Sequence, residues 1–365
     1  MQQLSSRIPS LKPAAGPALG LGVLPYVLCV GFAFLMHFAV GPIVGDFAMS
    51  VLLQAGIAIV LAVSLNIING FTGQFSIGHA GFMAVGGYVA GSISYYTSMI
   101  LWNSPAPHGG FLGSGQWLMA LGCVVGGAAA AGCGYLVGLP SLRLRGDYLA
   151  IVTLGFGEII RVLLQRTQPL LFTREEIVNA TASQLFPPPF GGAQGFERIP
   201  NSANLFWVFL ATAITVVFAV RLKHSSSGRA FLSIREDEIA ARAMGVNITK
   251  YKVRAFVLAA FFAGIAGGLY AHVVPILRPI DAGFQKSFEV IIMVVLGGMG
   301  SVSGVILAAI ILTILPELLR DFAQYRLIIY ALLLIVMMIV RPQGLFGVRE
   351  IWDYFPFAKK RSRAA

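Results

Sequence analysis

Long apolar runs separated by short polar connections dominate the chain from about its twentieth residue onward. Between residues 47 and 142 there is no Asp, Glu, Lys or Arg. A helix needs about 20 apolar residues to cross the hydrocarbon of a bilayer. On that criterion the pattern predicts about ten transmembrane helices, at 21–41, 47–68, 79–101, 117–139, 148–165, 205–222, 255–274, 287–300, 303–319 and 326–341. The range 287–300 is short and ends in glycines, which predicts a half-helix or part of a broken hairpin.

Composition supports a membrane protein over a soluble one. Of the 365 residues, 57% are hydrophobic and only 11% are charged, less than half the charged share of ordinary soluble domains. The predicted fold class is an all-α, polytopic membrane helix bundle occupying residues 21–341. A tail at 1–20 precedes it and a basic tail at 342–365 follows it.

Charge is concentrated in alternate connections. The net charge is +11, and the stretch 221–254 alone holds eight basic and three acidic residues. Basic residues gather in cytoplasmic connections of membrane proteins, so this pattern orients the chain in a lipid bilayer and argues against a nucleic-acid partner. It predicts cytoplasmic N- and C-termini, a cytoplasmic loop at 223–254 and an external loop at 166–204.

The usual chemical motifs are missing from the sequence. It contains no G-x-x-x-x-G-K-[ST] phosphate loop, no H-E-x-x-H and no G-x-S-x-G. The Cys and His spacing does not suit a metal. These absences argue against an enzyme, against a metal or cofactor bound by this chain, and against ATP hydrolysis by it. Without paired intramembrane acids, a proton-coupled pump is also disfavoured.

The cytoplasmic segment reads as one short amphipathic helix over 228–247. Ile234, Ile239 and Ala243 fall near one face, and Gly245 supplies a helix stop. Such a helix fits the groove of a partner or the surface of the membrane, and the pattern alone leaves both interpretations open.

Two groups of polar residues at membrane depth are candidates for a substrate route. Glu158 and Arg161 are spaced i, i+3 in one predicted helix, which allows a purely structural ion pair or a pair that lines the route. Between the second and third predicted helices, a polar break contains Asn66, Asn69, Gln74 and His79. It is either an ordinary turn or non-helical backbone around a protein-lined cavity.

The run IAARAMG at 239–245 resembles the EAA loop of ABC importer permeases, although the usual glutamate is displaced by one position. In that family the loop docks into the ATPase subunit. The resemblance marks a set of candidate ATPase-coupling residues: Arg235, Glu236, Asp237, Glu238, Ala240, Ala241 and Gly245.

Three further motifs resemble the LivM-type permeases of branched-chain amino acid ABC transporters. They are LNIINGFTGQFSIGHAG at 65–81, RLRGDYLAIVTLGFGEIIR at 143–161 and RPQGLFG at 341–347. They occur in the same order as in the family, and the resemblance extends from about residue 47 to 347.

This resemblance implies a type II ABC importer permease in a bacterial inner membrane. The implied partners are a second, LivH-type permease subunit, two cytoplasmic ATP-binding subunits that use ATP and Mg²⁺, and a periplasmic solute-binding protein. The implied cargo is leucine, isoleucine and valine. Two alternatives stay open: a urea or amide permease of the same family, and an ion-coupled secondary transporter.

Overall fold

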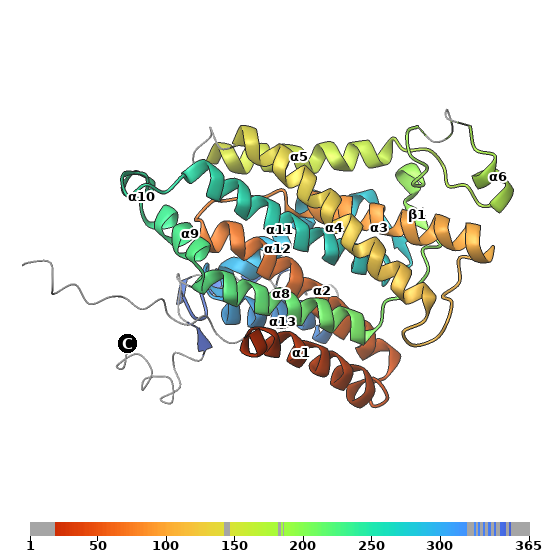
Figure 1. Ribbon diagram of the computed structural model, residues 1–365, viewed down its shortest axis with the longest axis horizontal. Coiled ribbons are helices and arrows are strands. Elements are labelled where there is room, and N and C mark those ends of the chain that lie inside the picture. The colour runs from red at the N-terminus through yellow and green to blue at the C-terminus, as the bar shows by residue number, and fades with distance from the viewer. Residues whose placement is uncertain are drawn as a thin grey trace, which may run out of the picture.

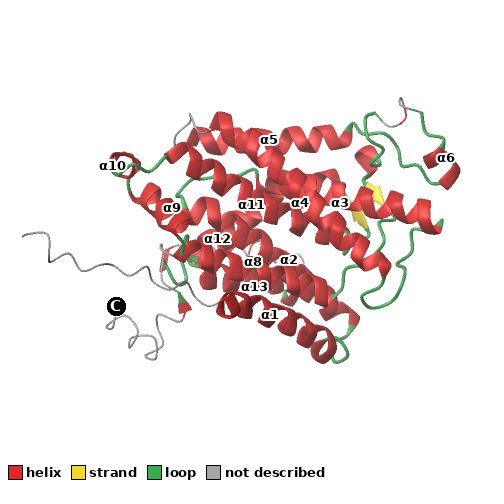
Figure 2. Cartoon of the chain, viewed as in Figure 1, coloured by secondary structure: helices red, strands yellow, loops and turns green. Residues whose placement is uncertain are grey.

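The computed structural model is built almost entirely of helices that run roughly along one common direction (Figures 1 and 2). It describes residues 19–141, 147–181, 184 and 186–319, together with 325, 328, 331, 332, 335, 336, 339, 340, 344–347, 350 and 351. The long helices are α1 (Leu19–Leu35), α2 (Asp46–Asn66), α3 (His79–Trp102), α4 (Ser114–Ser141), α5 (Asp147–Gln165), α8 (Leu205–His224), α11 (Ile248–Ala271), α12 (Phe284–Gly297) and α13 (Val302–Leu318). The shorter elements are α6 (Arg174–Val178), β1 (Phe196–Glu197), α9 (Ser226–Glu236), α10 (Glu238–Ala243) and β2 (Ile276–Leu277). The predicted all-α class agrees with this architecture.

Apolar composition and length mark many of these helices as membrane spans. Within the described residues, six segments are long and apolar enough to cross a bilayer: Val23–Val40, Asp46–Phe71, Ser114–Leu139, Tyr148–Gln165, Leu205–His224 and Ile248–Ala271. The first nine predicted ranges each coincide with a helix, whereas 326–341 falls largely outside the described residues. The chain is therefore a multi-pass membrane protein, and ten crossings stay a prediction.

The two connections predicted to face opposite sides of the membrane lie at opposite ends of the bundle. Figure 1 shows α9 and α10 at one end, with α6 and β1 of the loop 166–204 at the other. We refer to the end marked by α9 and α10 as the coupling end, after the coupling role expected from the sequence, and to the end marked by α6 as the loop end.

Glycine lets the central helices α3, α4 and α11 approach one another closely. A Cβ built on Gly86 of α3 would lie 2.2 Å from the carbonyl oxygen of Gly264 in α11. One built on Gly267 would lie 1.8 Å from the carbonyl oxygen of Met83. Backbone meets backbone at these positions, so any side chain would force the helices apart. Small residues at helix interfaces are a general means of membrane helix packing.

Helix α12 is short and begins after the chain reverses direction at the loop end. After α11 the chain folds back, and β2 pairs antiparallel with β1 while the Tyr88 hydroxyl donates to the Leu277 carbonyl at 2.9 Å. The 14 residues of α12 then extend about 21 Å, too short to cross a hydrocarbon core of about 30 Å. A short helix followed by a turn agrees with the prediction of a half-helix or part of a broken hairpin over 287–300, with an earlier start at Phe284.

Candidate functional site

The cytoplasmic segment folds as two helices, so the prediction of one helix over 228–247 is wrong. Asp237 separates α9 from α10 with an extended backbone (φ −156°, ψ 113°). Its carboxylate accepts hydrogen bonds from the N–H groups of Ile239 at 2.7 Å and Ala240 at 3.0 Å. Aspartate is a strong N-cap residue, and here it ends one helix and begins the next.

The break also changes which side chains are buried. Ile234 is 2% exposed and Ala241 4%, whereas Ile239 is 77% exposed and Met244 84%. The predicted common face of Ile234, Ile239 and Ala243 does not form, because α10 turns relative to α9 at Asp237. As a result, α10 presents Ile239 and Met244 outward at the coupling end.

Helix α10 is held to the bundle in spite of its outward face. Glu238 forms an ion pair with the buried Lys252 of α11. Gly245 follows the helix at φ +83°, in the left-handed region that favours glycine. The N–H of Val246 then donates to the Ala241 carbonyl at 3.0 Å. Helix α10 is thus a short helix that is held to the bundle and exposes apolar side chains at its tip.

Arg235 joins α9 to both places where the membrane helices are interrupted. Its guanidinium donates to the carbonyl of Gly70 at 2.8 Å and to the carbonyl of Met299 at 3.3 Å. Gly70 belongs to the wide helical turn η3 (Ile67–Phe71), which continues α2, and Met299 lies in the turn between α12 and α13. A displacement of α9 would therefore act on both interruptions at once.

The first interruption, residues 67–78, begins with the helical turn η3 and continues as non-helical backbone that is largely buried in the protein. Residues 73–78 have no regular structure, yet Gln74, Ser76 and Gly78 are buried. The side-chain oxygen of Asn69 accepts from the Ser76 N–H at 3.2 Å, and Thr72 donates to Gln74 at 3.3 Å.

Some polar atoms of this interruption find no partner. The Asn69 amide nitrogen, the Ser76 hydroxyl and His79 Nδ1 are buried without a hydrogen bond among the described residues, while His79 Nε2 lies 2.8 Å from the Ser64 hydroxyl. Folded cores leave few such atoms.

Asn66 ties the first interruption to the second. Its side chain accepts from the N–H of Gly300 at 2.9 Å and donates to the carbonyl of Ser301 at 3.2 Å. Gly298 and Gly300, at φ +102° and +95°, give this second turn its shape. Asn66 is thus positioned as a structural clamp between α2 and the α12–α13 turn.

Glu350 occupies the second interruption, and sequence reasoning missed it. Its carboxylate accepts from Lys223 Nζ at 2.6 Å and from the N–H groups of Val302 at 3.0 Å and Ser303 at 2.9 Å. Lys223 also donates to the Gly300 carbonyl at 2.8 Å. A carboxylate at the start of α13 suits the positive end of the helix dipole.

Glu158 and Arg161 pair as their spacing predicted. Arg161 Nε lies 2.6 Å from Glu158 Oε2, and Glu158 Oε1 accepts from the N–H of Phe284 at 3.2 Å. The pair therefore sits at the start of α12 rather than in the polar break. Helix α5 connects the two groups of candidates, because Thr153 of α5 accepts from the Ile77 N–H at 3.0 Å.

Comparison with known proteins gives the family. The family profile "Branched-chain amino acid transport system / permease component" matches residues 47–341. The chain belongs to this permease family. The high-affinity branched-chain amino acid transport system permease protein LivM of Escherichia coli K12 is 38% identical to this permease over 307 residues, covering 79% of this chain and 67% of the relative.

Two more distant relatives show the breadth of the similarity. The E. coli K12 permease protein LivH is 24% identical over 298 residues, covering 80% of this permease and 91% of the relative. The fructose import permease protein FrcC of Rhizobium meliloti is 25% identical over 228 residues, covering 60% and 61%. No solved structure matches this permease significantly.

Replacing Glu350 with glutamine should destabilise the permease by about 3–5 kcal/mol, because it leaves the Lys223 ammonium without its buried counter-charge. Burial raises the pKa of Glu350. Hydrogen bonds from the Lys223 ammonium and from the donors of Ser303 and Val302 lower it by a larger amount, so the pKa of Glu350 lies below its ordinary range.

A depressed carboxylate pKa fixes the sign of the pH effect. The stabilisation by Glu350 is complete at neutral pH and is lost as the pH falls below about 4.3 and through the folded-state pKa. Thermal inactivation of purified wild-type permease and the Glu350→Gln variant at pH 7 and pH 4 measures both effects. Equal stability of the two proteins at pH 7 would contradict the role of Glu350.

Proposed function

We propose that this chain is a translocation subunit of an ABC importer for branched-chain amino acids. Its proposed partners are a LivH-type permease subunit, two cytoplasmic ATP-binding subunits and an external solute-binding protein. In this proposal the chain is not an enzyme and binds no cofactor, and ATP and Mg²⁺ are used by the ATP-binding subunits. The family match and the relationship to LivM support the cargo.

The observation that carries the coupling role is the arrangement of α9 and α10. Helix α10 exposes Ile239 and Met244 at one end of the bundle. Helix α9 contacts the carbonyls of Gly70 and Met299 through Arg235. An ATPase subunit that binds α10 and displaces it together with α9 would therefore move the two interruptions of the membrane helices through Arg235. No long-range rearrangement of the core is needed for this movement.

The charge distribution supports a bacterial inner-membrane orientation with cytoplasmic N- and C-termini. The coupling end then faces the cytoplasm and the loop 166–204 faces outward. In this orientation the external solute-binding protein delivers solute to the loop end, and ATP acts at the coupling end. The half-helix α12 lies between the two.

Reconstitution tests the proposed function directly. Vesicles containing the full complex, with ATP inside the compartment reached by the ATP-binding subunits and loaded binding protein on the other side, should accumulate leucine. Vesicles with this chain alone should not. ATP-independent accumulation driven by an H⁺ or Na⁺ gradient in the second preparation would replace the proposal with a secondary transporter. Uptake of urea in place of leucine would reassign the cargo.

Glu158 and Arg161 are proposed to hold the start of α12 in the transport route. Neutralising either one, as Glu158→Gln or Arg161→Met, should reduce leucine uptake at least tenfold while the complex still assembles. Glu158 accepts a hydrogen bond from the first N–H of α12, so loss of the ion pair should shift α12. Because the Glu158–Arg161 pair is partly exposed, its loss should cost little folding stability. Uptake by both variants at the wild-type rate would remove them from the route.

A further inference from the structure

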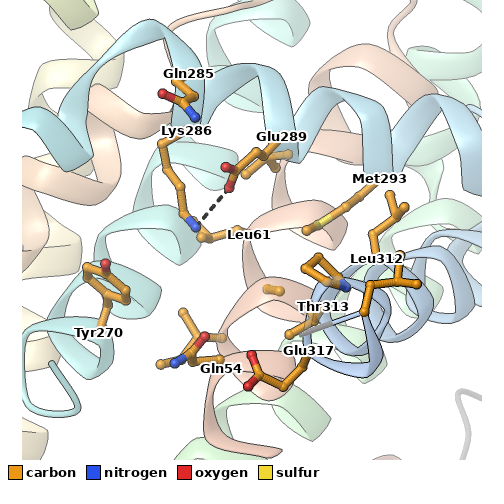
Figure 3. A pocket seen from close by; sticks show the side chains of 15 residues that line it. Gln54, Leu61, Tyr270, Gln285, Lys286, Glu289, Met293, Leu312, Thr313 and Glu317 are labelled. Atoms are coloured by element: carbon orange, nitrogen blue, oxygen red, sulfur yellow. Dashed lines mark hydrogen bonds and ion pairs between the residues drawn. The ribbon is translucent and has the colours of Figure 1, made fainter. Parts of the chain in front are cut away.

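A cavity of about 350 Å³ lies between α2, α11, α12 and α13. Figure 3 shows side chains meeting in it from these four helices. Its polar wall contains Gln54, Lys286, Glu289 and Glu317. Its apolar wall contains Ile57, Leu61 and Met293. The volume lies within the range of small-molecule sites, and a mostly apolar lining with a few converging polar groups is typical of them.

The cavity extends from near the middle of the bundle toward the loop end, because Tyr270 lies in the last turn of α11, Lys286 in the first turn of α12 and Glu317 in the last turn of α13. Gln54 and Leu61 both line it, and they flank the midpoint of the long segment Asp46–Phe71. Ionisable side chains at such depth are costly and mark substrate or ion pathways. Secondary transporters place substrate sites between helices that are interrupted within the membrane. Here α12 is such a helix.

Opposite charges stand on one face of α12. Lys286 Nζ lies 3.1 Å from Glu289 Oε2, and the two side chains are 33% and 40% exposed. Lys286 also lies in the first turn of α12, where the helix dipole adds positive potential. A partly exposed pair of this kind is weak, so each member can exchange its partner for a group of a bound molecule.

We propose that this cavity binds the translocated amino acid as a zwitterion. The substrate carboxylate lies against Lys286, and the substrate ammonium lies against the carboxylate of Glu289. The aliphatic side chain contacts Ile57, Leu61 and Met293. Binding exchanges the Lys286–Glu289 pair for two substrate-mediated pairs, so no charge is left without a counter-charge. This inference rests on the proposed function and names the site at which it is performed.

The chemistry of the cavity favours a zwitterion over neutral cargo. A sugar or urea carries no charge and would leave Lys286 and Glu289 paired only with each other. An α-amino acid brings one charge of each sign on neighbouring atoms, which matches a cation and an anion one helical turn apart. Aliphatic cargo also suits the Leu61 and Met293 side of the cavity.

Equilibrium binding to the assembled permease and ATPase complex, without the binding protein, tests the site. The probe is radiolabelled leucine, with leucinamide and isocaproate as competitors that lack the carboxylate and the ammonium, respectively. Lys286→Met should weaken leucine binding at least tenfold and abolish the preference of the site for leucine over leucinamide. Glu289→Gln should do the same for the preference over isocaproate.

A matched control makes the same chemical change outside the cavity. Glu175→Gln removes an exposed carboxylate from α6, and it should leave leucine binding unchanged. Binding equal to wild type in both Lys286→Met and Glu289→Gln would overturn the inference. Displacement of leucine by anionic lipid, with no discrimination among the three small molecules, would also overturn it and make the cavity a lipid headgroup site.

A second measurement does not depend on charge removal. Thr313 lines the cavity, and among the described residues its hydroxyl donates within α13, to the Ala309 carbonyl at 2.8 Å. Leucine should slow thiol labelling of a Thr313→Cys variant in a Cys133→Ser background, and leucinamide should not. Absence of protection in a complex that transports leucine refutes leucine binding in this cavity but leaves the proposed function intact. A complex that never transports branched-chain amino acids refutes both.

Discussion

Replacing Arg235 with methionine should reduce binding-protein-stimulated ATP hydrolysis and leucine uptake more than tenfold, in a complex that still assembles. The guanidinium makes charge-assisted hydrogen bonds to the Gly70 and Met299 carbonyls, and one such bond contributes about 1.5–3 kcal/mol. Loss of the guanidinium removes both bonds and so disconnects α9 from both interruptions of the membrane helices. Stimulated ATPase activity and uptake in proteoliposomes measure the effect.

Arg229→Met is the matched control on the same helix. Within the part of the chain that the structure describes, Arg229 donates to groups of its own segment, the His224 carbonyl and the Ser226 hydroxyl, each at 3.2 Å. Its replacement should affect stimulation much less than that of Arg235. Equal losses in the two variants would mean that basic charge on α9 matters and the contacts of Arg235 do not. Full stimulation in Arg235→Met would contradict the coupling role outright.

Gly267→Ala should destabilise the permease by about 3 kcal/mol, the upper end for overpacking in a tight core. The added Cβ would lie 1.8 Å from the Met83 carbonyl oxygen and 3.0 Å from the Gly87 nitrogen. These are backbone atoms, which cannot rotate away as a side chain can, so α3 and α11 must separate. A lower yield of monodisperse protein and a lower midpoint of thermal inactivation are the expected observations.

Gly132 of α4 provides the comparison, because a Cβ there meets nothing within 4 Å. Gly132→Ala should keep or slightly raise stability, since alanine in a helix loses less backbone entropy than glycine. If both alanine variants behave like the wild type, close backbone contact between α3 and α11 does not govern the stability of this bundle.

The membrane helices can be predicted from the sequence because each is a local property of the chain. Length and apolar composition alone place the first nine predicted ranges on described helices. The break between α9 and α10 was also readable in principle. Asp237 has the side chain of an N-cap residue and precedes Glu238 at the start of a helix. The amphipathic pattern of 228–247 favoured one continuous helix, so the break at Asp237 was not predicted.

The contacts that assemble the site are not local, and the sequence contains no signal for them. Arg235 and Gly70 are 165 positions apart. Glu350 lies in a stretch read as a basic tail, and only the folded chain brings it to Lys223 and to the first residues of α13. Lys286 and Glu289 had a readable signal, since they share the i, i+3 spacing of opposite charge that singled out Glu158 and Arg161.

Helix α12 is anchored at both of its ends, but to different parts of the molecule. Its start contacts Glu158 and follows β2, which pairs with β1 of the loop 166–204. Its end leads into Met299, which Arg235 contacts. The 14 residues of α12 therefore link the loop end to the coupling end. In the proposed importer, solute delivery acts at the start of α12 and nucleotide-driven movement at its end, so about four helical turns connect the two events.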